Sequence, residues 1–161
     1  MRLPPSLALC IVTFTAALTA STAAVAWPVD AATLRTYIDG CNRGIADACS
    51  NLGVSYESGY PKDEATAADY YTQACNAGSD VGCYNLGLDY DKGKGVALDY
   101  VEGLRWEHKA CDMGYGKACA VVGMQYYNGQ GVVRDDGLAT NYLGRACAKG
   151  LTEYCSGGGA K

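Results

Sequence analysis

The chain has 161 residues, of which 49% are apolar and 19% charged, a composition typical of one globular domain. Its net charge of −4 gives no excess of Lys and Arg for a phosphate backbone, which argues against a nucleic-acid partner. His108 is the one histidine, so a histidine-rich metal site is excluded. We therefore expect neither a bound metal nor a cofactor.

Residues 1–26 have the three parts of a secretory signal peptide. Arg2 supplies the positive charge, residues 7–20 form an apolar run, and small residues lead up to Ala26. The run has about 14 residues where a membrane span needs about 20, so a membrane anchor is the weaker interpretation. We expect cleavage after Ala26, no stable membrane span, and a secreted or periplasmic mature chain of residues 27–161.

The cysteines of the mature chain are evenly spaced. Removal of Cys10 with the leader leaves eight, and an even number in a short exported chain indicates a disulfide framework. They form pairs separated by eight positions, and the pairs recur after 34, 36 and 36 residues. A period in the mid-thirties predicts an α/α solenoid with two helices per repeat. The pairs are Cys41 and Cys49, Cys75 and Cys83, Cys111 and Cys119, and Cys147 and Cys155.

Helix ends can be placed from the residues around these pairs. A glycine stands three residues after each first cysteine, where the end of a helix favours a left-handed residue. Asp63, Asp99 and Asp135 can each cap a helix that ends near the next cysteine. The predicted helices are 30–43, 46–58, 63–77, 80–91, 99–113, 116–127 and 135–149. They divide the mature chain into a half repeat (30–43), repeats of about 46–78, 80–114 and 116–150, and a truncated unit (151–161).

The segment after each second cysteine has a regular helical pattern. Apolar residues and tyrosines stand four positions apart, with Gly53, Gly87 and Gly123 between them for close approach of a neighbouring helix. In the second and third units a GxGV turn follows, and in the first unit this turn is two residues shorter.

These motifs together resemble Sel1-like repeats. The resemblance rests on NLGxxY, the GxGV turn, the aspartate that begins the second helix and the terminal Ala-Cys, and it covers residues 30–155. Within these repeats, the chain resembles the cysteine-rich secreted branch first seen in Helicobacter cysteine-rich proteins. The resemblance implies an all-α, TPR-like solenoid, and it implies β-lactam binding or weak β-lactam hydrolysis as an activity.

We predict that the two cysteines of each pair are bonded to each other. One lies at a helix end and the other in the first turn of the next helix, and the tight end of a helical hairpin can bring α-carbons to about 5.5 Å. Zinc sites favour shorter spacings and thioredoxin-like chemistry uses C-x-x-C, so both are the weaker alternatives. Four loops of this length contribute up to about 10 kcal/mol on the chain-entropy model.

Motifs for hydrolysis are missing from the sequence. No mature serine is followed three residues later by Lys, and neither S-D-N nor K-T-G occurs. His108 is a weak candidate for a general base. Its equivalents in the other repeats are Thr72 and Gly144, so a packing role on its helix is the favoured alternative.

A polar strip is predicted along the first helices, which line the concave surface of helical arrays. It combines the positions two, six and nine after each second cysteine, and it is either a ligand groove or a solvated face. Tyr84, Tyr115, Tyr127 and Tyr154 fall outside the repeat register and are further contact candidates. The strip consists of Asn51, Ser55 and Ser58, then Asn85, Asp89 and Lys92, then Val121, Gln125 and Asn128.

The sequence therefore predicts an exported, disulfide-rich repeat scaffold that binds a protein, peptide or cell-wall-derived ligand on its concave face, as a monomer. The alternative function, drawn from the family resemblance alone, is a β-lactam-binding protein or weak β-lactamase, whose ligand would be a β-lactam or a peptidoglycan-derived small molecule. An inert spacer is the third candidate, and three repeats span little distance for that role.

Overall fold

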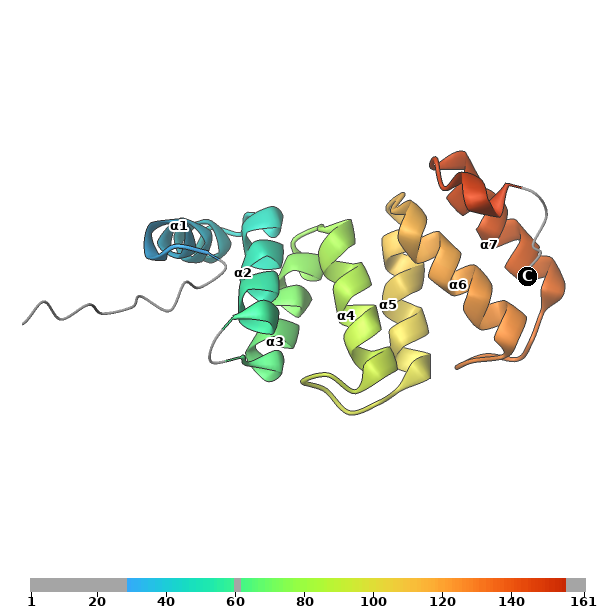
Figure 1. Cartoon of the computed structure of the whole chain (residues 1–161), viewed down its shortest axis with the longest axis horizontal. Helices are drawn as coiled ribbons and strands as arrows, with labels where there is room; N and C mark the ends of the chain where they lie inside the picture. The colour runs from blue at the N-terminus through green and yellow to red at the C-terminus, as the bar shows by residue number, and fades with distance from the viewer. Residues whose placement is uncertain (1–28, 60–61, 156–161) are drawn as a thin grey trace, which may run out of the picture.

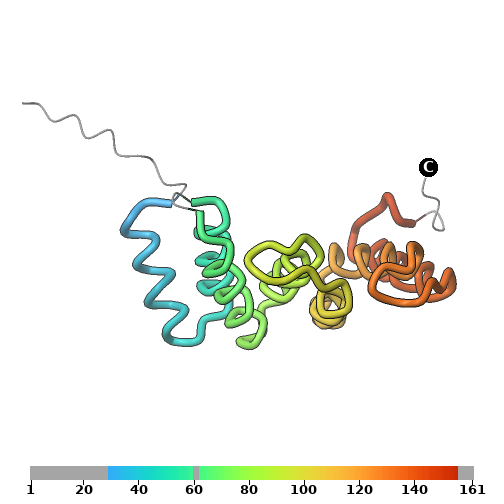
Figure 2. Tube along the Cα trace, turned by 90° about the horizontal axis from the view of Figure 1, so that it is seen from below, coloured from blue at the N-terminus to red at the C-terminus, as the bar shows by residue number. Residues whose placement is uncertain are grey.

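The computed structural model describes residues 29–59 and 62–155, and in these ranges the chain is helical throughout its regular elements. The helices follow one another along the long axis of the molecule, as both views show (Figure 1, Figure 2). The predicted all-α solenoid is confirmed, with every helix boundary within one residue of its expected place. The elements are α1 (Ala31–Asn42), α2 (Ala46–Ser58), α3 (Glu64–Asn76), α4 (Asp80–Lys92), α5 (Tyr100–Asp112), α6 (Gly116–Asn128), α7 (Asp136–Ala148) and the short 3-10 helix η1 (Thr152–Tyr154). The predicted signal peptide, residues 1–26, lies outside the described residues.

Aspartates begin the second helix of each repeat, as the sequence predicts. The side chains of Asp63, Asp99 and Asp135 accept hydrogen bonds from backbone N–H groups in the first turns of α3, α5 and α7. These N–H groups have no partner inside the helix, so each cap supplies an acceptor that the helix lacks. The four glycines after the first cysteines have positive φ, from 77° to 100°, which confirms the predicted helix ends.

Each helix packs on the next, most extensively within the pairs α2–α3, α4–α5 and α6–α7. The helix α2 also contacts α4, so the first helices of consecutive repeats share one side of the molecule. Close packing inside a repeat depends on its central glycine: a Cβ at Gly87 would collide with the Cγ atom of Glu107 and lie 3.0 Å from the Gly103 carbonyl oxygen. The predicted role of these glycines in close helix approach is therefore confirmed.

The core consists of small and medium side chains with tyrosines between the helices. Leu52, Leu86 and Val122, from equivalent positions, are at most 1% exposed. Tyr56 stacks on Tyr70, with ring centroids 5.4 Å apart, and Tyr126 stacks on Tyr142 at 5.7 Å. Because Tyr56 and Tyr126 recur at the same repeat position, the repeated tyrosines pack the hairpins, as expected.

Four disulfides close the helical hairpins, with the predicted connectivity. The bonded pairs are Cys41–Cys49, Cys75–Cys83, Cys111–Cys119 and Cys147–Cys155, with Cα–Cα distances of 4.5 to 4.9 Å.

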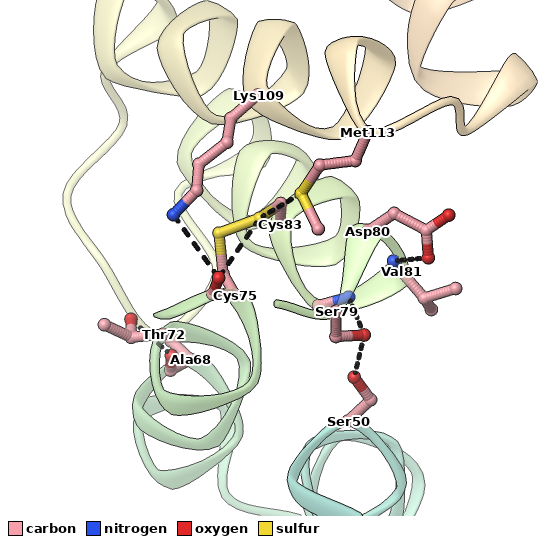
Figure 3. Close-up of a disulfide and its surroundings, with 11 residues drawn as sticks. Ser50, Ala68, Thr72, Cys75, Ser79, Asp80, Val81, Cys83, Lys109 and Met113 are labelled. Carbon is pink, nitrogen blue, oxygen red and sulfur yellow. Dashed lines mark hydrogen bonds between the residues drawn. A yellow bond between two sulfur atoms is a disulfide. The ribbon is translucent and has the colours of Figure 1, made fainter. Parts of the chain in front are cut away.

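The surroundings of Cys75–Cys83 show how these bonds join neighbouring repeats (Figure 3). Lys109 Nζ, from the next repeat, donates to the Cys75 carbonyl oxygen at 3.3 Å. On the other side, the hydroxyl oxygens of Ser50 and Ser79 lie 2.8 Å apart in a buried hydrogen bond. This hairpin end is thus held both covalently and by a contact from the next repeat.

Across residues 29–59 and 62–155, every helix is too short or too polar to span a bilayer.

Candidate functional site

The predicted polar strip is interrupted by burial. Its first and last positions are at the surface, with Asn51 and Asn128 exposed and Asn85 half-buried. The middle position is buried in every repeat: Ser55 is 4% exposed, Asp89 4% and Gln125 2%.

The contacts of the middle position explain this difference. The amide nitrogen Nε2 of Gln125 donates to Asp91 Oδ2, one repeat earlier, at 2.8 Å, and the Ser55 hydroxyl donates to the carbonyl of Asn51 at 2.7 Å. The side chain of Gln125 therefore turns into the boundary between α4 and α6 instead of toward solvent. Ser55, Asp89 and Gln125 therefore interrupt the strip as buried residues. A binding role for the residues of the predicted strip stays a prediction.

A pocket of about 300 Å³ opens between α4, α6 and η1. It contains Val121 and Gln125 of the predicted strip, together with Tyr84 and Tyr154 from outside the repeat register. The ring of Tyr115 packs against that of Tyr84, with centroids 5.0 Å apart. The full lining is Tyr84, Asp91, Lys117, Ala120, Val121, Met124, Gln125, Gln130, Leu151, Glu153 and Tyr154.

Most lining residues were not identified by sequence reasoning. Asp91 stands eight residues after a second cysteine, and the first repeat also has an acid, Glu57, at that position. An alignment of the repeats could therefore have pointed to Asp91 as a candidate site residue. Leu151 and Glu153 carry no such signal, because η1 enters the site only through the turn that follows α7.

A buried polar cluster lies behind the pocket. Glu107 is fully buried, and both its carboxyl oxygens, Asp91 Oδ1 and Gln125 Oε1 lack a hydrogen-bond partner. Burial, together with the neighbouring charge of Asp91, raises the pKa of Glu107 to about 8. Burial also raises the pKa of Asp91.

His108 lies away from this pocket, in an aromatic cluster between α5, α6 and α7. Its Nε2 atom is 3.4 Å from the Tyr126 hydroxyl, and its ring meets that of Tyr142 edge-on with centroids 4.9 Å apart. Burial lowers the pKa of His108, so the ring is neutral at pH 7. Its surroundings are those of a packed aromatic side chain, and its catalytic role remains an untested prediction.

In the described part of the chain, no group of three His, Cys, Asp or Glu side chains is placed to hold a metal ion. The eight cysteines there are bonded in pairs, so their sulfur atoms are not free ligands.

The succession of helical hairpins, each closed by a disulfide, defines an α/α solenoid of the Sel1 and TPR class. The Sel1 repeat model matches residues 46–79, 81–115 and 116–151. The chain therefore belongs to the Sel1 repeat family.

Solved structures of other Sel1 repeat proteins have the same fold. A protective antigen from uropathogenic Escherichia coli, described as having an SLR fold, is 29% identical with a TM-score of 0.71 over 75% of this chain, which spans 26% of the antigen. A Sel1 repeat protein from Oxalobacter formigenes is 25% identical with a TM-score of 0.69, covering 75% of this chain and 92% of its own. Helicobacter pylori cysteine rich protein B is 27% identical with a TM-score of 0.64, and the match covers 77% of this chain and 90% of that protein. The comparison with curated proteins gave no significant match.

Proposed function

We propose that the protein is an exported scaffold that binds a protein partner on the side formed by α2, α4 and α6. The observation that carries this proposal is the pocket between α4, α6 and η1. It is the place where side chains of two repeats and of the C-terminal turn come together around a hollow, as binding sites between helices commonly do.

The rigidity of the fold supports a binding role. Three of the four disulfides are buried, and the fourth, Cys147–Cys155, ties η1 to α7 beside the pocket. A site held in place before binding loses little conformational entropy on binding. Sel1 repeat proteins in general mediate protein–protein interaction, which agrees with this assignment.

Export is part of the proposal. Disulfides persist in oxidising compartments and are rare in the cytosol. The similarity to Helicobacter pylori cysteine rich protein B agrees with a location outside the cytoplasm. The β-lactam alternative has no observation in its favour, because the one histidine is packed among tyrosines, and we do not propose it.

Site-directed photo-crosslinking tests the binding proposal. A photoreactive amino acid replaces Val121 in the pocket, and in a matched control it replaces Asp69, which is exposed on α3. In living cells of the source organism, we expect one dominant cross-linked partner from position 121 and not from position 69. Equal products from the two positions, or none from position 121, would overturn the proposed function.

A further inference from the structure

We propose that the pocket between α4, α6 and η1 accepts the basic side chain, Lys or Arg, of a bound protein segment. This inference rests on the proposed function and adds the chemical class of the contact.

The size of the pocket suits one long side chain. Its volume of about 300 Å³ lies at the lower limit of small-molecule sites, which run from about 300 to 1,000 Å³. The apolar side chains of Met124 and Leu151 line it and can cover an alkyl stem. A Lys or Arg side chain inserted from a partner fits within this volume.

Two tyrosines in the lining favour a cation. Tyr84 comes from α4 and Tyr154 from η1, and each is half-buried, so part of each ring is open to a ligand. The face of an aromatic ring attracts an ammonium or guanidinium group, and the attraction increases where water is partly excluded. The two rings thus provide suitable contacts for the charged end of Lys or Arg.

The charged residues of the lining are mostly acidic. The lining has two acidic residues, Asp91 and Glu153, and one basic residue, Lys117, which is exposed. Gln125 fixes Asp91 through the bond from Nε2 to Oδ2, and Gln125 is only 2% exposed. With its nitrogen committed to Asp91, the unpartnered atom of that amide is its oxygen, Oε1.

Two buried oxygen atoms of the lining residues also favour a positively charged ligand. Asp91 Oδ1 and Gln125 Oε1 are both acceptors without a donor. The amide oxygen of Gln125 carries a partial negative charge, and the carboxyl oxygen of Asp91 is negative when the group is ionised. Both act through a poorly solvated region, where screening is weak. These two oxygen atoms therefore favour a positively charged ligand in the pocket. The net charge of −4 on the chain favours a basic partner at longer range.

The test is a titration of the ¹⁵N-labelled, oxidised protein with capped pentapeptides, followed by NMR at low salt. The peptides are acetyl-Gly-Gly-X-Gly-Gly-amide, where X is Lys, norleucine or Glu; norleucine keeps the alkyl chain of Lys without its ammonium group. We expect saturable shifts at the amides of Tyr84, Met124 and Glu153 with the Lys peptide. The norleucine peptide should bind about fivefold more weakly, and the Glu peptide more weakly still.

Two variants at exposed positions identify the electrostatic contribution. Glu153→Gln should weaken binding of the Lys peptide about threefold, and Lys117→Gln should strengthen it by a similar factor, because the first removes an attractive charge and the second a repulsive one. Circular dichroism checks that both remain folded. Unchanged affinity in both variants would overturn the proposal.

The peptide series separates this inference from the function on which it rests. If norleucine or Glu peptides bind the pocket as well as the Lys peptide, the pocket binds protein segments but the basic class is wrong. If no peptide shifts the pocket amides, both the inference and the pocket's role in the proposed function are overturned.

Discussion

The guanidinium group of Arg145 on α7 donates a hydrogen bond to the backbone carbonyl oxygen of Cys111 at 3.1 Å. One period earlier, Lys109 makes the same contact with the carbonyl of Cys75. Arg145 also donates to the carboxylate of Asp112 at 2.9 Å. A basic side chain from one repeat thus stabilises the C-terminus of the second helix in the preceding repeat, where the helix dipole favours positive charge.

Removal of this contact should weaken the junction between repeats. We expect Arg145→Gln to lower the free energy of unfolding by about 1 kcal/mol, because a charged hydrogen bond at a half-exposed site is lost. Urea denaturation followed by circular dichroism measures the change. Arg134→Gln is the matched control, since Arg134 pairs with Asp136 at an exposed site, where an ion pair contributes little to stability, so its effect should be the smaller of the two. Equal effects of the two substitutions would contradict the assigned role of Arg145.

Close packing at Gly87 gives a second prediction. In Gly87→Ala, the added Cβ would collide with Glu107 and lie in tight contact with the backbone of α5, so we expect a loss of about 2 kcal/mol in the free energy of unfolding. In the control, Gly144→Ala, nothing lies within 4 Å of the added Cβ. The control should therefore stabilise α7, by up to about 1 kcal/mol, because Ala favours helix over Gly. A neutral Gly87→Ala would show that the helices are not in close contact there.

The buried carboxyl of Glu107 should make stability depend on pH. Its pKa is about 8 in the folded protein against 4.5 as the ordinary value, with Asp91, Lys92 and Gln125 as the groups that act on it. The folded state therefore binds the proton more tightly, so the stabilisation is fully present below about pH 4.5 and is lost as pH rises through 8.

Urea denaturation at pH 5 and pH 8 measures this dependence. The wild-type protein should lose on the order of 3 kcal/mol more stability between these values than Glu107→Gln, which has no proton to release. Asp89, whose pKa burial raises to about 7, acts in the same direction and remains in the variant. Burial of His108 acts in the opposite direction, because its lowered pKa reduces stability as the pH falls through about 6.5. Equal losses in the two proteins would show that Glu107 does not titrate in this way.

The four disulfides should differ in their access to reductant. Cys155 is exposed and Cys147 half-buried, whereas the other six bonded cysteines are at most 7% exposed. Thiol–disulfide exchange needs contact with the attacked sulfur, so graded reduction should open Cys147–Cys155 first. Alkylation followed by peptide mass spectrometry identifies the order. Earlier opening of Cys75–Cys83 would contradict the burial of that hairpin end.

Export can be tested at the N-terminus of the protein. We expect protein recovered from the periplasm or the medium to begin at Trp27, because cleavage after Ala26 is predicted. Amino-terminal sequencing reads this directly. An intact start at Met1 in a cytoplasmic fraction, with free thiols, would contradict the export proposal.

Sequence reasoning predicted the elements of this fold because their signals are local. The capping aspartate of a helix, the glycine after its end and the cysteines of one hairpin all lie within a few turns of one another. The pairing of Cys75 with Cys83, for example, requires only that a helix end, a reversal and a new helix follow in order. Repetition of the pattern in each unit made the helix boundaries consistent along the chain.

Only the tertiary structure decided which polar positions face solvent and where a pocket opens. Helical periodicity places Gln125 on the same face as Asn128, but contact with Asp91 one repeat earlier turns its side chain into the interior. The pocket likewise joins Tyr84, Met124 and Tyr154 from separate elements. Their meeting depends on the angle between repeats and on the path of the chain after α7, and no local pattern of residues encodes either one.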